Sequence, residues 1–419
     1  MVNLPADFVA ETRRIMGDER YNRFVGAFDE EAPTSIRVNP RIAIDHGPWT
    51  IDHSDSQVPW CSEGYYLNDR PQFTFDPLLH AGCYYVQEAS SMFVTHVLRT
   101  VDSSQFALDL CAAPGGKSTA LRSVLPDDCV LISNEPMGNR AQILLENVTK
   151  WGGPNHIVTN NYPRDFRKAK LKFDLILCDV PCSGEGMFRK DPNAISEWSA
   201  QNVEKCWQLQ REIVADAWEC LNPGGLLIYS TCTYNTKENE ENIRWILDTY
   251  DALVLDIPVD PSWNITGSLL EGFNESVYRF IPGITRGEGL FVCALRKNTR
   301  KDEGGRSKEI SSADIIKNKN LKVLDPGILL PPSSLLPSPK VDVVYATALK
   351  YLRGEALVLP ADTPRGIVTI TYQGQPLGPA KNIGNRANNL YPKAWRIKST
   401  HLPSEPPEVI NIRTTEEVL

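Results

Sequence analysis

The sequence predicts a doubly wound α/β domain in its centre, preceded by a small α+β domain and followed by a small β-rich one. The prediction rests on strand and helix patterns that alternate between residues 101 and 296, and on changes of composition on either side of that block. Of the 419 residues, 42% are apolar and 23% are charged. This composition is typical of globular proteins and excludes collagen-like and wholly disordered chains.

Residues 1 to 100 begin with a helical pattern, in which Phe8, Ile15, Tyr21 and Phe24 recur, and continue into a short strand-like segment that ends at Pro40. No run of about 18 apolar residues occurs, so we expect no membrane span. The first residues are amphipathic and mixed in charge, unlike a signal peptide. We therefore expect a cytoplasmic protein whose ten cysteines are thiols.

The central block contains five short apolar runs suited to buried parallel strands. They are residues 106–111, 130–134, 156–160, 174–179 and 226–231. Between them, residues 141–151 and 200–221 carry apolar side chains at helical spacing. A sheet of this kind binds ligands at the carboxyl ends of its strands, so the functional residues are expected there.

The amino-acid composition of the chain changes after residue 296. Residues 297 to 340 begin with a charged, glycine-containing stretch, which predicts a linker, and end with a proline- and leucine-rich stretch that is predicted to pack on a neighbouring domain. Strand-like patterns return at 356–360 and 366–378. They predict a small β-rich domain over residues 341 to 419.

The net charge is unevenly distributed. The total is −8, from 44 Lys and Arg against 52 Asp and Glu, but residues 1–100 carry −6, residues 101–296 carry −8 and residues 297–419 carry +6. A basic module on an acidic body predicts contact with a polyanion, although a solvated basic surface without a partner would give the same pattern.

A glycine-rich turn follows the first predicted strand. In ALDLCAAPGGKST, residues 107–119, an apolar strand leads through Pro114, Gly115 and Gly116 into a helix. Glycine lets backbone N–H groups approach a ligand closely, and a loop at this place holds a nucleotide-like cofactor. The turn matches neither the P-loop nor the GxGxxG pattern, so phosphate binding is a poor fit.

An acidic residue, Glu135, ends the second predicted strand. A carboxylate there can accept two hydrogen bonds from the hydroxyls of a ribose, whereas an isolated acid at a strand end is usually only a surface group. Together with the glycine-rich turn, Glu135 predicts a site for a nucleoside cofactor.

Two cysteines and an aspartate follow the next strands. Asp179 ends the fourth predicted strand, Cys182 follows it in a Pro-Cys turn, and Cys232 ends the fifth strand. We expect both thiols at the sheet edge that holds the cofactor loop. A lone cysteine is most often a buried apolar filler. The spacing excludes a CxxC redox pair, and no cysteine–histidine cluster predicts zinc.

These motifs resemble those of a known family. CAAPGGK, DVPCSGEGMFRKDP and STCTYNTKENE are similar to motifs of the Sun/NSUN family of S-adenosylmethionine-dependent RNA cytosine-5 methyltransferases, and GMFRKDP favours the bacterial RsmF branch, which acts on 16S ribosomal RNA. The resemblance implies a Rossmann-like class I methyltransferase sheet over residues 101–296. It also implies an N-terminal α+β domain over 1–100, a linker over 297–340 and a PUA-like RNA-binding domain over 341–419.

Carried over position by position, the resemblance implies a role for each motif residue. Cys232 is the nucleophile, Cys182 assists release of the product, and Asp179 contacts both the cofactor and the target base. Glu135 binds the ribose of S-adenosylmethionine. The pocket for this cofactor is lined by Cys111, Ala112, Ala113, Pro114, Gly115, Gly116 and Lys117.

One position departs from the family pattern. Members often carry an Asp beyond the third strand that holds the adenine end of the cofactor, and Tyr162 stands there in this chain. We expect Asn161 to hydrogen-bond to the adenine edge and Tyr162 to stack on the ring.

The implied chemistry needs two thiols and one acid. Carbon 5 of cytosine is a poor nucleophile until a thiolate adds to carbon 6. A protonated Asp179 is expected to donate its proton to ring nitrogen 3. Cys182, directly or through water, is expected to act as the base that removes the carbon 5 proton. Lys117 or Lys190 is expected to favour the thiolate of Cys232.

The target base must be unstacked, so single-stranded or loop RNA is the expected substrate. By resemblance this is ribosomal RNA, naked or within a 30S subunit or its precursor. We expect a monomer without a metal or a membrane. The predicted RNA contacts are Arg189, Lys190, Lys381, Arg386, Lys393 and Arg396, the last four in a tract where Tyr391 and Trp395 are interleaved.

Three other functions stay open from the sequence. The chain could methylate cytosine in tRNA, or it could be a catalytically silent RNA-binding factor in ribosome assembly. A silent factor would not need Asp179, Cys182 and Cys232 together. Methylation of DNA cytosine would place the nucleophile in the Pro-Cys turn and leave Cys232 without a role.

Overall fold

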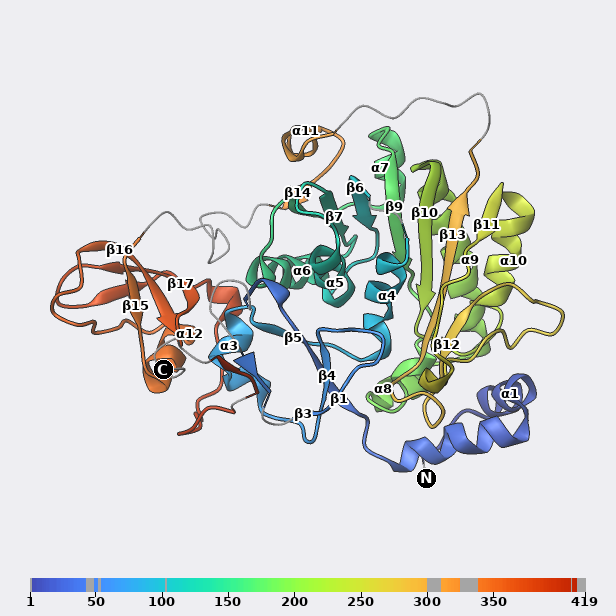
Figure 1. Cartoon of the computed structure of the whole chain (residues 1–419), viewed down its shortest axis with the longest axis horizontal. Helices are drawn as coiled ribbons and strands as arrows, with labels where there is room; N and C mark the ends of the chain where they lie inside the picture. Colours follow the sequence, from blue (N-terminus) through green and yellow to red (C-terminus); the bar gives the residue numbers. More distant parts are fainter. Residues whose placement is uncertain are drawn as a thin grey trace.

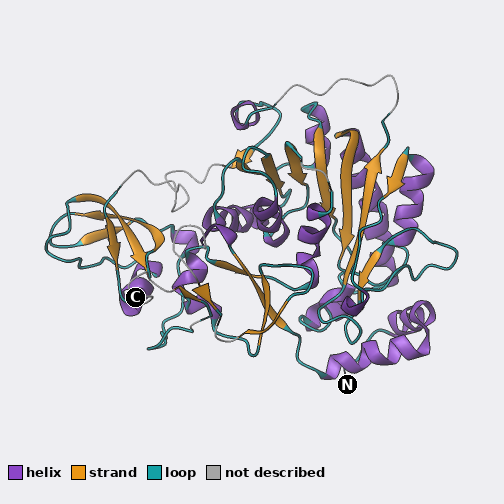
Figure 2. Cartoon of the chain, in the orientation of Figure 1, coloured by secondary structure: helices purple, strands orange, loops and turns teal. Residues whose placement is uncertain are grey.

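The structure is a computed structural model that describes residues 2–42, 49–51, 54–101, 104–299, 310–324, 338–407 and 409–412. Figure 1 shows three parts: a large central sheet flanked by helices, a small sheet at the N-terminal side and a separate β-rich part near the C-terminus. In Figure 2 the helices of the central part lie on both faces of its sheet. The predicted α/β fold with two flanking domains is confirmed.

The N-terminal part combines a long helix with a four-stranded sheet. Helix α1 (Ala6–Gly26) kinks at Gly17, whose φ of +73° favours glycine. The sheet has the order β3-β4-β1-β5, and β1 (Thr34–Val38) confirms the strand predicted before Pro40. Its other strands are β3 (Ser54–Gln57), β4 (Gly64–Leu67) and β5 (Tyr84–Val86). The short helix α3 (Pro77–His80) lies between β4 and β5, and α4 (Phe93–Arg99) follows β5.

The central sheet has the order β11-β13-β10-β9-β6-β7-β8-β14, with β12 also paired to β13. All five predicted strands are present and parallel to one another. They are β6 (Phe106–Asp109), β7 (Val130–Asn134), β8 (His156–Thr159), β9 (Phe173–Asp179) and β10 (Leu221–Thr231). The antiparallel edge consists of β11 (Ala252–Val254), β12 (Tyr278–Phe280) and β13 (Leu290–Lys297).

Helices bury both faces of this sheet. On one face, α4 and α5 (Gly116–Val124) pack in a core with Ala107 and Leu131. On the other, α7 (Pro163–Lys168), α9 (Ala200–Glu219) and α10 (Glu240–Thr249) pack around Leu108 and Ile176. Helix α6 (Gly138–Trp151) confirms the helix predicted over 141–151, and α8 (Pro192–Glu197) follows the Pro-Cys loop. Because both faces are covered, the strands are apolar throughout.

The segment between the central and C-terminal parts was predicted to begin with a linker. In the structure, part of it forms regular elements. Helix α11 (Ser312–Ile316) and β14 (Val323–Leu324) lie against the central part, and β14 extends its sheet by pairing with β8. Ile315, which is fully buried, anchors this segment in the central core. The predicted packing of leucines between 326 and 337 falls outside the described residues.

The C-terminal part is a sheet of order β15-β16-β17-β18 with helix α12 (Tyr345–Leu352). Its strands are β15 (Lys340–Asp342), β16 (Gly366–Tyr372), β17 (Gln375–Asn382) and β18 (Ala387–Asn389). The predicted strand at 356–360 is only a single bridge, between Leu357 and Ala387. A two-stranded pair, β2 (Trp49–Thr50) with β19 (Asn411–Ile412), joins the two ends of the chain.

The C-terminal part shares a hydrophobic core with the N-terminal part. Ile36 and Val38 of β1 belong to the same buried cluster as Leu349 of α12 and Val368 of β16. The hydroxyl of Tyr345 also donates to the Phe75 carbonyl. The predicted C-terminal module is therefore packed on the body and not simply tethered to it.

Candidate active site

The loops that follow β6, β7, β9 and β10 meet at one edge of the central sheet. They bring together the glycine-rich turn, Glu135, Asp179 and the two cysteines, which come from four separate segments of the sequence. Every helix of the described residues is too short or too polar to cross a membrane. The same residues contain no cluster of three or more His, Cys, Asp or Glu side chains that could hold a metal ion.

The glycine-rich turn is held by hydrogen bonds from its neighbours. The backbone N–H of Ala112 donates to Asn134, and side chains of α6 cap two carbonyls of the turn: Arg140 donates to Ala113 at 2.9 Å and Asn147 to Pro114 at 2.8 Å. Gly115 has a φ of +117°, a backbone conformation that side chains rarely adopt. The turn is thus fixed before any ligand binds.

Two buried carboxylates flank the turn. Glu135 is 1% exposed, and one of its oxygens accepts from the Met137 N–H at 2.8 Å. Asp109, which ends β6, accepts from the Ser118 hydroxyl at 2.6 Å, and its other oxygen has no hydrogen-bond partner in the described part of the chain. Burial raises the pKa of Asp109 to about 7. Sequence reasoning missed Asp109, although the rule that selected Glu135 applies to it equally.

The residues at this edge fit S-adenosylmethionine. Asp179 and Glu135 both act electrostatically on Asp109, and Lys117 is the cation beside Asp179 and Asp109. This excess of carboxylates suits a ligand that carries a sulfonium and an ammonium, and the unpartnered oxygen of Asp109 is a buried acceptor for a donor group. Glu135 stands where a ribose would be held.

Asp109 gives the unliganded protein a pH dependence that can be measured. Its pKa rises from 3.8 to about 7 on folding, so the folded state binds the extra proton between these values, and stability falls as pH rises through this window. Asp109→Asn keeps an acceptor for Ser118 but does not titrate. Between pH 5 and pH 8 we expect the variant to lose less stability than the wild type, by about 1–3 kcal/mol. Thermal unfolding at both pH values measures this; equal losses would contradict it.

Asp179 is anchored on both oxygens. Lys117 donates to one at 2.8 Å and the Ser230 hydroxyl donates to the other at 2.7 Å. Burial lowers the pKa of Lys117, but the Asp179 carboxylate and the Cys232 sulfur raise it, and the net pKa lies above the usual value. The two side chains form an ion pair at 2.8 Å. The role of a protonated Asp179 toward the base stays a prediction.

The two cysteines lie side by side. The Sγ atoms of Cys182 and Cys232 are 3.3 Å apart, although 50 residues separate them in the sequence. All ten cysteines are free thiols, as predicted. The hydrogen bond to Cys232, together with burial, raises the pKa of Cys182 well above its usual value. Either sulfur can be the donor in this contact.

The loops that carry the thiols are locked to each other. The Gly186 N–H donates to the Cys232 carbonyl at 2.7 Å, and a Cβ at Gly186 would lie 2.5 Å from that oxygen, so only glycine fits. Glu185, 1% exposed, accepts from the backbone N–H groups of Tyr234 and Asn235. These contacts explain the Gly-Glu-Gly of the motif, which the sequence alone did not interpret.

Arg189 was predicted to contact an RNA phosphate, but its side chain is engaged within the protein. Its side chain is 6% exposed and pairs at 3.0 Å with Glu288, which is 5% exposed. It also donates to the Glu30 carbonyl after α1. Arg189 thus joins three segments of the body. Lys190 is exposed next to it and remains a predicted RNA contact.

In the predicted basic tract of the C-terminal part, some residues are exposed and others pack within the fold. Lys381, Arg386 and Lys393 are exposed. Arg396 is half-buried, and its Nη2 donates to the carbonyl of Tyr391. The aromatic ring of Tyr391 is in the core, and Trp395 lies against Lys150 of α6. Neither ring is thus a stacking platform for RNA bases, because both are used for packing between the parts.

The adenine side of the site also differs from the prediction. The Asn161 side chain exchanges two hydrogen bonds with the backbone of Lys322, so it secures β14 and is not available to an adenine edge. Tyr162 is 55% exposed before α7, with the guanidinium of Arg164 over its ring at 5.2 Å, and its stacking on the adenine ring stays a prediction.

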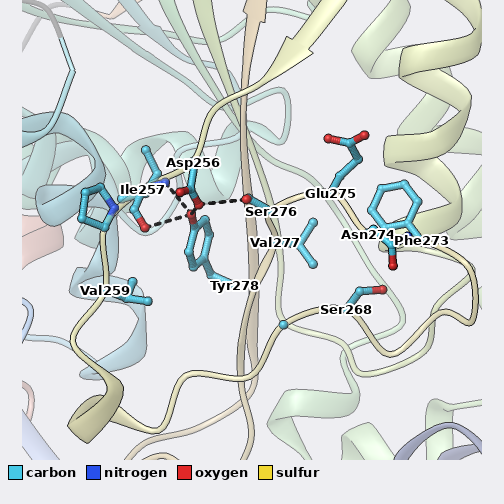
Figure 3. A pocket seen from close by; sticks show the side chains of 12 residues that line it. Asp256, Ile257, Val259, Ser268, Phe273, Asn274, Glu275, Ser276, Val277 and Tyr278 are labelled. Carbon is cyan, nitrogen blue, oxygen red and sulfur yellow. Dashed lines mark hydrogen bonds between the residues drawn. The ribbon is translucent and has the colours of Figure 1, made fainter.

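A pocket that contains none of the predicted site residues lies elsewhere. It has a volume of about 650 Å³ and is formed by residues 256–259, 267–268 and 273–278. In Figure 3 the side chains of Asp256, Ser276 and Tyr278 are joined by hydrogen bonds on its wall. These bonds tie together the two ends of the loop between β11 and β12, so we assign the pocket no part in the chemistry.

The fold and the site define an S-adenosylmethionine-dependent methyltransferase with two adjacent thiols. The chain matches three family models in succession: the N-terminal domain of 16S rRNA methyltransferase RsmF over residues 4–89, 16S rRNA methyltransferase RsmB/F over 96–296, and the methyltransferase RsmF PUA domain over 338–397.

Individual relatives agree with these matches. Ribosomal RNA small subunit methyltransferase F of Serratia proteamaculans is 34% identical over 71% of this chain and 64% of its own length. The protein of the same name from Escherichia coli is 28% identical over 94% of this chain and 96% of its own length. The chain belongs to the RsmF branch of the RsmB/F methyltransferase family.

Solved structures share the fold. A methyltransferase homologue from Pyrococcus horikoshii is 27% identical, with a TM-score of 0.58 over 71% of this chain and 96% of its own. NSun6 from the same organism is 20% identical with the same TM-score, over 71% of this chain and 99% of its own, which shows the fold alone.

Proposed function

We propose that this enzyme methylates carbon 5 of a cytidine in 16S ribosomal RNA through a covalent bond between Cys232 and carbon 6 of the base. The observation that carries the proposal is the pair of thiols 3.3 Å apart at the edge that holds the cofactor loop. One methyl transfer needs only one nucleophile, so a second thiol in contact with it indicates a covalent intermediate that must be resolved.

Cys232 is the nucleophile of the proposal. Its sulfur lies 3.3 Å from the Sγ of Cys182 and interacts electrostatically with the ammonium of Lys117, and a nearby cation favours a thiolate. When its thiolate adds to carbon 6, carbon 5 becomes nucleophilic. S-adenosylmethionine, when bound, supplies the electrophilic methyl group.

Lys117 and Asp179 are proposed to stabilise the negative charge that develops on the base. Addition to carbon 6 sends electron density toward ring nitrogen 3, where a proton or a hydrogen-bond donor must stabilise it. Lys117 donates to Asp179 at 2.8 Å, so the carboxylate positions this ammonium. We assign Lys117 the donor role that the sequence had suggested for Asp179.

Cys182 acts after the methyl group has moved. Its pKa is raised chiefly by the hydrogen bond to Cys232. Once Cys232 is bonded to carbon 6, its sulfur no longer carries a negative charge, and this effect disappears. Cys182 can then ionise and accept the carbon 5 proton, directly or through water. Loss of this proton re-forms the double bond and expels the Cys232 thiolate.

Replacing Lys117 with methionine tests the assigned charge. The change removes the cation from both Cys232 and Asp179 while keeping an unbranched side chain that is only one atom shorter. We expect the rate to fall about 10²- to 10⁴-fold, with the rise of rate with pH displaced to higher pH, because the thiolate is less favoured. Lys190→Met is the matched control, and an equal displacement in both variants would contradict the assignment.

The proposed substrate is 16S ribosomal RNA. We propose that the enzyme meets it within the 30S subunit or a precursor of that subunit. We propose a cytoplasmic monomer that needs no metal. Incubation with methyl-labelled cofactor and 16S rRNA, naked and at successive assembly stages, followed by nucleoside analysis, tests the function. Labelled 5-methylcytidine is the expected product. Label in another nucleoside, or label from tRNA alone, would refute it.

A further inference from the structure

The first turn of α5 has one face toward the candidate active site and another toward the N-terminal part. On the first face, Lys117 donates to Asp179 at 2.8 Å, and the Ser118 hydroxyl donates to Asp109 at 2.6 Å. The glycine-rich turn leads directly into this helix. The position of one helical turn therefore affects the glycine-rich turn and both carboxylates together.

The other face of α5 is held by Arg37, which lies on β1 of the N-terminal part. Its Nη2 donates to the Thr119 hydroxyl at 2.6 Å and to the Gly116 carbonyl at 3.4 Å. Its Nη1 donates to the Ser123 hydroxyl at 3.0 Å. Within the N-terminal part, its Nε donates to Gln87 at 2.8 Å. One guanidinium thus binds three residues of α5 and fixes them to the N-terminal part.

Arg37 is a buried charge whose hydrogen-bond partners are neutral. Its side chain is fully buried, and its guanidinium lies 4.3 Å from the centroid of the Trp151 ring. Its acceptors in the described part of the chain are an amide, two hydroxyls and a backbone carbonyl. Burial lowers the pKa of Arg37 to about 10, so the side chain stays charged at neutral pH. Well-packed apolar residues often replace buried charges without loss of stability, so packing alone does not account for an arginine here.

The start of α5 also packs closely on the N-terminal part. A Cβ at Gly116 would lie 3.5 Å from the ring of Tyr85 and 3.6 Å from the Nε2 of Gln87, which are van der Waals distances. Gln87 is 5% exposed, and its Nε2 has no hydrogen-bond partner among the described residues. The Gln87 amide therefore serves mainly to hold Arg37, which in turn holds the helix.

We propose that Arg37 is a positioning residue for the cofactor site, which holds the first turn of α5 where the glycine-rich turn and Lys117 need it. The N-terminal part is then a structural component of the cofactor site, although it contributes no residue that touches the cofactor. The inference concerns the binding of S-adenosylmethionine and does not depend on which base is methylated.

The test compares two variants at the interface between the N-terminal and central parts. Arg37→Met removes the guanidinium but keeps an unbranched side chain that can pack on Trp151. Asn39→Ala is the matched control, because Asn39 is 4% exposed and donates to the Gly82 and Trp151 carbonyls, so it links the N-terminal part to α6 and not to α5. Calorimetry measures the affinity for S-adenosylhomocysteine, which is the cofactor without its methyl group, and thermal unfolding measures stability.

We expect Arg37→Met to weaken the binding of S-adenosylhomocysteine by about 10- to 100-fold, because hydrogen bonds from a charged donor no longer hold the turn. Asn39→Ala should lose thermal stability but bind this ligand as tightly as the wild type. The affinity for 16S rRNA, measured without cofactor, should be the same in all three proteins, since Arg37 is buried.

Thr119→Val approaches the same contact from the α5 side. It removes the hydroxyl that accepts from Arg37 and keeps nearly the same shape. It should also weaken the binding of S-adenosylhomocysteine. Combined with Arg37→Met, it should weaken binding no further than Arg37→Met alone, because both changes remove one contact.

An unchanged affinity for S-adenosylhomocysteine in Arg37→Met would overturn the inference. An equal loss in Asn39→Ala would also overturn it, because the effect would then come from a loosened interface and not from α5. If Arg37→Met does not fold, Thr119→Val decides in the same way. Since the binding assay contains no RNA, a failure of the proposed cytidine chemistry would leave its result unaffected.

Discussion

Replacing Cys232 with alanine should abolish methyl transfer, with a loss of at least about 10⁴-fold in rate. The thiol forms the only covalent bond to the base in the proposed reaction, in which Cys182, the thiol beside it, acts only in the later proton transfer. Cofactor binding should be retained, because the glycine-rich turn, Glu135 and Asp109 are unaffected. Methyl transfer to 16S rRNA and cofactor affinity, measured on the same preparation, test this.

Cys206→Ala is the control for Cys232. Cys206 is half-buried on α9 and forms no hydrogen bond with either thiol of the pair, so its variant should keep wild-type activity. Activity that survives Cys232→Ala would assign the nucleophile to Cys182, as in the DNA-type alternative.

Replacing Cys182 with alanine should trap the enzyme on its substrate. Without the group that accepts the carbon 5 proton, the methylated base cannot leave Cys232, so a protein–RNA adduct accumulates after one turnover. Multiple turnover should fall by about 10²- to 10⁴-fold. A denaturing gel detects the adduct as a slowly migrating band that needs both RNA and cofactor.

The double variant Cys182→Ala with Cys232→Ala decides whether this band is the proposed intermediate. The band should disappear in it, since the sulfur that binds carbon 6 is gone. A band of equal strength in the double variant would mean that another residue is joined to the RNA.

The sequence predicted the five parallel strands and the edge where the thiols meet, because both follow from local patterns. Short apolar runs identify the strands, and Asp179 and Cys232 stand directly at their carboxyl ends. The same rule would have found Asp109, which ends β6 immediately before the glycine-rich turn.

What the sequence could not predict depends on partners far along the chain. Arg189 is neutralised by Glu288, and Asn161 is bound to Lys322, so neither is available to a ligand. A basic or amide residue beside a motif looks the same whether its partner lies in RNA or in the fold. Tyr391 illustrates this for aromatic residues, since its ring is in the core.

The distance between the sulfur atoms of Cys182 and Cys232 could not be predicted from the sequence either. Their motifs predicted one edge of a sheet, whereas the 3.3 Å contact results from the Gly186 and Glu185 hydrogen bonds that join the two loops. This contact places both thiols within reach of one bound base.

Peptide mapping of the trapped adduct tests the central claim most directly. The Cys182→Ala enzyme is incubated with cofactor and 16S rRNA, both nuclease and protease digest the product, and tandem mass spectrometry locates the modified residue. We expect a methylated cytidine nucleotide attached to Cys232. A nucleotide attached to any other residue, or turnover at the wild-type rate without an adduct, would contradict the account.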